Sequence, residues 1–392
     1  MAEVTQNNEN EDYNDRIKKH RLRTRTIFAA VALVIVVVTV SILVSRYRSG
    51  YGHYVTLNSV LRQESESASY IPFAGGFLRY SRDGAAMVSY SGEQYWNQTY
   101  RMDNPVIDIC GNYAVIANVK GTDYYLFDKS GFITSINTAL PIACARVSGQ
   151  GLVCVALVDA GATYISMYDK SGGKIYSIKS TIDGDGVPVS LDVSPNGEML
   201  MVSYSTLNNQ EISTGIVFYS FNEVGQNESE RIVAGFDTYG STLVSRVTFL
   251  SESNAVAVGE NVVSFFRIKE YPKLITDVSV SGTIKQVFTS EAYVGLIVET
   301  EEQAERIQIF DLNGNRKYEA STEEGYNRYE LCEDGFVMYG ENEACLVSMS
   351  GKVLYRGEIS DGASRMYSLS GNDEYLLVSR NMIERIKMKR GD

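Results

Sequence analysis

Histidine, cysteine and carboxylate residues are the groups that could carry chemistry in this chain of 392 residues. The two histidines, His20 and His53, both lie near the N-terminus. The sequence from residue 54 onwards therefore excludes Ser–His–Asp and Cys–His catalysis and any histidine metal site. It also contains no P-loop and no G-x-G-x-x-G motif after a strand. We predict no catalytic, cofactor-binding or metal-ligating residue, and no cofactor.

Carboxylates are the remaining candidates, because a pair of them can act as general acid and base. The chain carries 43 Asp and Glu residues after position 50, and no motif singles out a pair. Asp183-Gly184-Asp185-Gly186 resembles the start of a calcium-binding loop. The third ligand position falls on Val187, however, and no glutamate follows at the required distance. These residues are therefore predicted to form a turn.

The cysteines are odd in number and contain no C-x-x-C pair; they are Cys110, Cys144, Cys154, Cys332 and Cys345. Each lies in or beside an apolar run, and free cysteine behaves as a small buried hydrophobe. Core packing is the expected role. The alternative is one disulfide, within the Cys144/Cys154 or the Cys332/Cys345 neighbourhood, since an extracytoplasmic site permits disulfides.

Charge divides the chain unevenly. The formal net charge is −12, but residues 1–50 carry eight Lys/Arg against five Asp/Glu, whereas the remainder carries 28 against 43. A domain with a net charge of −15 repels phosphate backbones, which argues against a nucleic-acid partner. Solubility is the simplest role for this charge.

One segment has the length and composition of a membrane span. Ile27 to Val44 is a run of 18 uncharged residues in which only Thr39 and Ser41 are polar. Six Lys/Arg precede it and two follow it closely, which favours a cytoplasmic N-terminus and an extracytoplasmic remainder. The sequence predicts a disordered cytoplasmic tail over 1–25 and a transmembrane helix over 26–45. A cleaved signal peptide is the less favoured alternative, because the run is long and ends in a poor cleavage site.

A turn phrase recurs beyond residue 65: a strand, then Asp or Ser, two residues, Gly, and a second strand. Asp or Ser bonds the backbone amides ahead of it and Gly accepts a positive φ, so the phrase predicts a hairpin. The turn glycines are spaced by 37 to 41 residues within the clear runs, and a large aromatic follows four of them after four residues. The copies are Val88–Gly92, Phe127–Gly131, Tyr168–Gly172, Phe310–Gly314 and Val347–Gly351, and the aromatics are Trp96, Tyr176, Tyr318 and Tyr355.

A period near 40 with four short strands per unit is typical of a β-propeller blade. We predict an all-β fold with one propeller over 67–390, of eight blades with seven as the alternative; a parallel β-helix fits the hairpins less well. A short linker over 46–66 is expected to include a closing strand, Tyr54–Leu61, for the last blade. Asn222–Glu230 is expected to be a hairpin insertion. The predicted units start near Ser67, Asn104, Ile142, Val187, Thr242, Thr283, Tyr326 and Ala363.

The repeat resembles the quinoprotein-type propeller repeat, in which Trp follows the turn Gly by four residues, as in Ser89–Trp96. Quinone-dependent dehydrogenases of that superfamily carry Trp in most blades and often a vicinal disulfide. This chain has one Trp and no adjacent cysteines, so the resemblance implies the non-enzymatic members, which are protein-binding scaffolds at membranes.

The whole chain also resembles an uncharacterised family of membrane-anchored propeller proteins from Gram-positive anaerobic bacteria. The resemblance rests on the layout and on phrases such as Tyr70–Phe73, Tyr95–Tyr100, Asn104–Asp108 and Phe221–Asn227. It implies a single-pass topology and a propeller fold, and it transfers no functional residue.

These observations favour a membrane-anchored extracytoplasmic scaffold that contacts the lipid bilayer through Ile27 to Val44. Its expected partner is another envelope protein or a cell-wall polymer, with no nucleic acid and no catalysis. Two alternatives are a sensory ectodomain that signals through the short tail, and a carboxylate-based hydrolase or lyase in the propeller channel.

Overall fold

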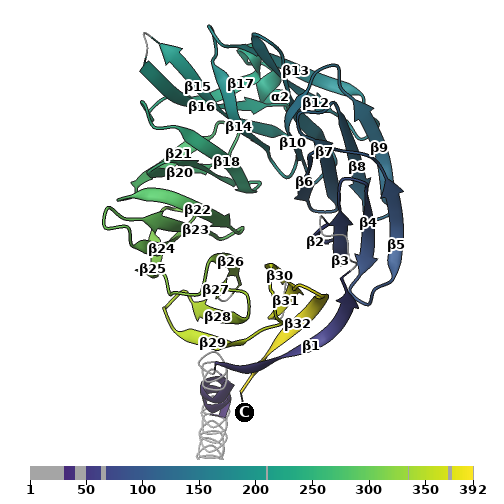
Figure 1. Cartoon of the computed structure of the whole chain (residues 1–392). Helices are drawn as coiled ribbons and strands as arrows, with labels where there is room; N and C mark the ends of the chain where they lie inside the picture. Colours follow the sequence, from purple (N-terminus) through teal and green to yellow (C-terminus); the bar gives the residue numbers. More distant parts are fainter. Residues whose placement is uncertain are drawn as a thin grey trace, which may run out of the picture. The chain divides into compact units, whose positions relative to one another are not determined.

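The strands are short, from five to eleven residues, because turn residues interrupt the apolar runs. The computed structural model describes residues 31–39, 50–62, 68–208, 211–333, 335–369 and 373–391. The described strands form eight antiparallel sheets of four strands each, which form a ring of blades (Figure 1). Eight blades are thus confirmed, and the alternatives of seven blades or a parallel β-helix were wrong.

Each blade consists of four consecutive strands, except that the last blade takes its fourth strand from the N-terminal side. The first four blades are β2 (Ser69–Phe73), β3 (Gly76–Tyr80), β4 (Gly84–Ser89) and β5 (Gln94–Thr99); β6 (Pro105–Cys110), β7 (Tyr113–Asn118), β8 (Asp123–Asp128) and β9 (Gly131–Asn137); β10 (Ile142–Val147), β11 (Val153–Val158), β12 (Ala162–Tyr168) and β13 (Lys174–Thr181); β14 (Val187–Val193), β15 (Met199–Asn208), β16 (Glu211–Ser220) and β17 (Ile232–Phe236).

The other four blades follow the same order. They are β18 (Val244–Ser251), β19 (Asn254–Gly259), β20 (Val262–Arg267) and β21 (Lys273–Ser279); β22 (Thr283–Thr289), β23 (Tyr293–Glu299), β24 (Glu305–Asp311) and β25 (Arg316–Ser321); β26 (Arg328–Cys332), β27 (Gly335–Tyr339), β28 (Glu343–Ser348) and β29 (Val353–Glu358); β30 (Arg365–Leu369), β31 (Glu374–Val378), β32 (Met382–Arg390) and β1 (Tyr51–Leu61).

The last blade closes the ring with residues from both ends of the chain. Its sheet order is β1-β32-β31-β30, so β1 lies outermost beside β32. This confirms the prediction that Tyr54–Leu61 supplies the fourth strand. The pairing satisfies backbone groups on the outer edge of β32, which would otherwise be an unpaired sheet edge.

Burial follows the position of a strand in its blade. The second and third strands lie between neighbouring blades on both faces, so they read as continuous apolar runs; five of the six residues of β11 are buried. The fourth strands lie at the periphery and alternate, as β5 does with Trp96 half-buried between exposed neighbours. The first strands surround the axis (Figure 1).

Alternating strand directions give the ring two faces. We call the face where every first strand begins the entry face, and the face where it ends the exit face. Second strands end, and third strands begin, at the entry face. The turns between third and fourth strands lie at the exit face.

The recurrent turns adopt the predicted conformation. In the third blade the Asp169 Oδ1 atom accepts hydrogen bonds from the backbone N–H groups of Ser171 and Gly173, at 2.8 and 2.9 Å. Gly172 has a φ of 86°, which a residue with a side chain adopts only with strain. The strand register shifts between Met167 and Tyr168, just before this turn, so a bulge accompanies the hairpin.

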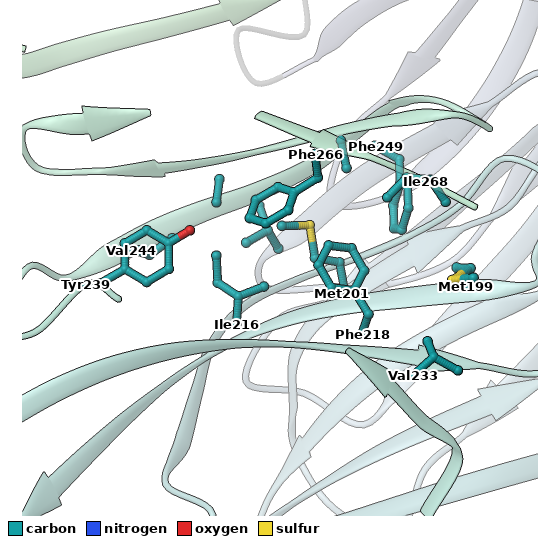
Figure 2. Close-up of a cluster of buried hydrophobic side chains, with 13 residues drawn as sticks. Met199, Met201, Ile216, Phe218, Val233, Tyr239, Val244, Phe249, Phe266 and Ile268 are labelled. Carbon is teal, nitrogen blue, oxygen red and sulfur yellow. The ribbon is translucent and has the colours of Figure 1, made fainter. Parts of the chain in front are cut away.

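Aromatic residues that follow the turns pack between blades, as expected. Trp96 of the first blade stacks on Phe127 of the second, with ring centroids 5.0 Å apart and parallel planes. Tyr318 of the sixth blade lies 4.9 Å from Phe336 of the seventh. Aromatic rings also fill the large core between the fourth and fifth blades. The ring centroids of Phe218 and Phe266 are 5.3 Å apart there, and Phe218 is fully buried (Figure 2).

Two expectations need correction. Asn222–Glu230 is not a hairpin: it contains the short helix α2 (Glu223–Gln226) and a 3₁₀ turn, Ser229–Arg231. The reason is that the Asn222 side chain accepts a hydrogen bond from the Val224 N–H group at 3.0 Å and so caps a helical turn. The alternative of a disulfide was also wrong, since all five cysteines are described and none is bridged.

The predicted membrane span lies only partly within the described residues. Residues 31–39 are helical, whereas 26–30, 40–45 and the tail over 1–25 lie outside the described part of the chain. Among the helices that are described, none is both long and apolar enough to cross a bilayer.

Candidate functional site

The described residues that the sequence pointed to lie on separate elements. Asp183 and Asp185 lie in the exposed turn between β13 and β14. His53 is exposed on β1, and His20 lies outside the described residues. The described chain contains no group of three His, Cys, Asp or Glu residues that could hold a metal ion.

Charged side chains that the sequence did not single out gather on the channel wall. Arg146 of β10 lies between two carboxylates on neighbouring first strands. Its Nη1 atom is 3.9 Å from the Oδ1 atom of Asp108, on β6, and its Nε atom is 3.7 Å from the Oδ1 atom of Asp192, on β14. We call these three residues the channel triad. They bring together positions 84 residues apart in sequence.

The triad also satisfies the inner edges of the blades. A first strand has no strand partner on its axial side, so its outward backbone groups need other partners. Asp108 accepts a hydrogen bond from the Val147 N–H group and Asp192 accepts one from the Phe249 N–H group, both at 2.8 Å. Arg146 donates to the Leu191 carbonyl oxygen at 3.2 Å. The second, third, fourth and fifth blades are thereby tied in succession.

Burial changes the acidity of these groups. It raises the pKa of Asp192 to about 7; the nearby Asp108 charge adds to the rise, and the Phe249 N–H group and Arg146 oppose it. Burial likewise raises the pKa of Asp108, against the lowering effect of Arg146. The same cause raises the pKa of the Cys110 thiol to about 11, so this cysteine is un-ionised at neutral pH.

The triad lines a cavity of about 640 Å³, whose wall also includes Cys110, Ser190 and Arg246. This volume suits a small ligand. The signal in the sequence was a polar residue within an otherwise apolar first strand, such as Asp108 between Ile107 and Ile109. That signal is weak, because it does not say which strands meet.

A second feature lies on the entry face of the third to fifth blades. Six large aliphatic side chains, all 42% to 64% exposed, lie at ends of strands that meet there. We call this set the apolar surface; it consists of Val158, Ile182, Val187, Leu207, Ile212 and Leu243.

The β15–β16 hairpin projects the most exposed of these residues. Both strands have ten residues, and Leu207 pairs with Ile212 near the tip. The neighbouring strand β14 reaches only to Ser205, and β17 begins its pairing at Ile216. The tip therefore has no strand beside it on either side.

Acidic residues flank members of the apolar surface in the sequence. Asp159, Asp183, Asp185 and Glu211 are exposed and adjoin its members in sequence. Exposed apolar side chains gathered on one face beside polar residues are characteristic of protein–protein contact surfaces.

Comparison with known proteins supports the fold. The chain is similar to the crystal structure of BamB from Moraxella catarrhalis, with 13% identity and a TM-score of 0.54, over 86% of this chain and 100% of that one. It is similar to the Dos1 propeller, with 11% identity and a TM-score of 0.56, over 86% and 97% of the two chains. It is also similar to the crystal structure of the eukaryotic initiation factor, with 12% identity and a TM-score of 0.51, over 86% and 88% of the two chains.

At such low identity these likenesses establish the propeller architecture alone. No curated protein sequence matches the chain. The profile of a family of unknown function, DUF5711, matches residues 46–388, nearly the whole propeller, and the chain therefore belongs to that family.

Proposed function

We propose that this protein is a membrane-anchored extracytoplasmic propeller that binds a protein partner through the apolar surface. The observation that carries the proposal is the combination of Leu207 and Ile212, 64% and 53% exposed at a projecting hairpin tip, with the acidic residues around them. Apolar side chains in such a place cost solubility, so a partner that covers them would be favoured. The partner's surface would be apolar at its centre and basic at its rim.

The anchor is part of the proposal. Ile27 to Val44 carries no charge, and six basic residues before it against two after it favour an extracytoplasmic propeller. The helical conformation of residues 31–39 is compatible with a spanning helix.

A protein suits this surface better than a cell-wall polymer does. The six residues of the apolar surface are aliphatic, with no aromatic ring on which a sugar could stack. Acidic residues around them would repel a polymer that carries phosphate or carboxylate groups. The polymer is therefore the second choice for this face.

Site-specific photo-crosslinking in the full-length protein tests the proposal. A photoreactive residue at position 207 or 212 should give one discrete adduct in membranes, and a Leu207→Ser, Ile212→Ser variant should fail to compete for the same partner. Ile175 is the matched control, because it is 54% exposed on β13 near the exit face. Equal crosslinking from positions 175 and 207, or no adduct at 207 and 212, would contradict the proposal.

A second function is favoured by one observation. Asp192 has a pKa of about 7 and lines a cavity together with Asp108, which suits general acid–base catalysis of hydrolysis or elimination. Both carboxylates are, however, already engaged by backbone N–H groups. Covalent labelling of Asp192 by a carboxyl-directed epoxide, blocked in an Asp192→Asn variant, would support this alternative; no labelling would remove it.

A further inference from the structure

A different cavity, of about 470 Å³, opens near the entry face where the seventh, eighth and first blades meet. Three arginines line it: Arg62, which follows β1, Arg328 at the start of β26, and Arg365 at the start of β30. We call them the arginine cluster. Tyr70, Tyr80 and Tyr367 form aromatic parts of its wall.

The described contacts leave much of the arginine cluster's donor capacity unused. Arg62 donates from Nη1 to the Ser379 carbonyl oxygen at 3.2 Å, and its guanidinium lies 5.5 Å from the Tyr70 ring centroid. Arg328 donates from Nη1 to the Ala363 carbonyl oxygen at 3.1 Å. A guanidinium has five N–H donors, so each has others available for a ligand.

The cluster also lacks ion-pair partners. The Glu330 carboxyl interacts electrostatically with Arg365, but burial raises its pKa to about 7, so it is only partly ionised at neutral pH. No carboxylate lines the cavity among the described residues, and none of the ion pairs formed by those residues includes Arg62, Arg328 or Arg365. Three like charges in one cavity repel one another, and the repulsion is unusual in a region where acidic residues outnumber basic ones by 43 to 28. A bound anion would offset it.

We infer that this cavity binds the oxyanion group, phosphate or carboxylate, of a small ligand. Arginine forks match both groups, since two parallel N–H donors meet two oxygens. The volume accommodates a molecule of metabolite size, and the tyrosine rings can cover its apolar part. The site is independent of the protein-binding role proposed above, because it shares no residue with the apolar surface.

Isothermal titration of the full-length protein in detergent micelles tests the inference. The probes are glycerol 1-phosphate and glutarate at fixed ionic strength. We expect saturable binding of at least one probe, and at least a tenfold loss of affinity in an Arg328→Gln, Arg365→Gln variant. Arg267→Gln is the matched control: this arginine lies at the end of β20, near the exit face, and bonds Asn313 at 3.2 Å. It should bind as the wild type does.

The probe that binds identifies the ligand's oxyanion. If neither probe saturates, or the double variant binds like the wild type, the inference is overturned. A thermal unfolding curve shows whether the double variant is folded; if it is not, the single variants Arg328→Lys and Arg365→Lys should still weaken binding, since lysine keeps the charge and loses the fork.

The chain's own acidic residues supply a further control. Glu64 and Glu66 fall between Arg62 and Ala68 in the sequence, outside the described residues. A Glu64→Gln, Glu66→Gln variant should bind the probe at least as tightly as the wild type. If this variant binds the probe and the wild type does not, the two glutamates neutralise the arginine cluster in the wild type, and the inference is overturned. Leu207→Ser should leave anion binding unchanged, so the two proposals can fail separately.

Discussion

The channel triad and the arginine cluster use the same residue type in opposite ways. Arg146 lies within 4 Å of the Asp108 and Asp192 carboxylates and donates to the backbone of the next blade. Arg62 and Arg328 also donate to backbone carbonyl oxygens, but form no ion pair among the described residues, and no described carboxylate lines their cavity. In the first arrangement each charge has an opposite charge within 4 Å and the blades are tied together, whereas the second leaves positive charge available.

The first arrangement thus stabilises the fold, whereas the second is suited to binding a ligand. A charge pair that also satisfies backbone groups resists change, because removing one member leaves a partly buried charge without its ion-pair partner. A cluster of like charges destabilises the fold through mutual repulsion, and a bound anion would offset that repulsion. The contrast predicts that mutations in the two regions affect different measurements.

The largest expected effect is that of Arg146→Met. It leaves Asp108 and Asp192 close together without a cation, and we expect a loss of about 2 kcal/mol or more in the free energy of unfolding. Urea unfolding followed by the fluorescence of Trp96, the single tryptophan, measures it. Adding Asp192→Asn should restore part of the loss. An unchanged midpoint for Arg146→Met would show that the triad does not stabilise the wall.

The second prediction concerns pH and Asp192. Since its pKa is raised from 3.8 to about 7 in the folded state, the native protein binds more protons than the unfolded chain between these values. Stability attributable to this group is therefore full below pH 4 and is lost as the pH rises towards 7. Asp192→Asn removes the dependence and keeps an acceptor for the Phe249 N–H group.

Unfolding curves at pH 5 and pH 8 check this prediction. From pH 5 to pH 8 the free energy of unfolding of the variant should rise by on the order of 1 kcal/mol relative to that of the wild type. Parallel stability profiles for the two proteins would mean that Asp192 titrates near its ordinary pKa in the fold.

The third prediction applies to the arginine cluster. Glu330 of β26 has a pKa raised by burial to about 7, against the lowering effects of the Ser368 N–H group and Arg365. Tyr339 and Tyr367 face it as well, and Arg328 lies on the same strand. An anion bound near Arg365 would disfavour ionised Glu330, so affinity should rise as the pH falls through 7.

Glutarate is the suitable probe, because it stays ionised between pH 6 and pH 8. We expect a several-fold tighter affinity at pH 6 than at pH 8, and a flat profile for Glu330→Gln. If the variant retains the slope of the wild type, the titrating group lies elsewhere.

The smallest effect is expected from Arg328→Met on stability. Arg328 loses one hydrogen bond to the Ala363 carbonyl oxygen and some repulsion from its neighbours, so the change should stay within about 0.5 kcal/mol. Urea unfolding of this variant beside Arg146→Met gives the direct comparison. Equal destabilisation by both substitutions would erase the distinction between the two regions.

Local sequence was sufficient for most of the fold. Turn residues such as Asp169 and Gly172 act on their own backbone within five positions, so the hairpins, the blade period and the closing strand could be predicted from residue order. The prediction of a hairpin at Asn222 was wrong, because asparagine is favoured both at the start of a hairpin turn and at the N-cap of a helix.

By itself, therefore, the sequence determined the eight repeats and the apolar segment before them, since both depend on short-range patterns of hydrophobicity and turn chemistry. Only the tertiary structure decided which charges meet. Asp108, Arg146 and Asp192 come together because ring closure brings the first strands of consecutive blades side by side. Arg62 and Arg328 line one cavity because the N-terminal strand β1 pairs with β32 in the last blade. No periodicity encodes such contacts, since they arise from closure of the ring.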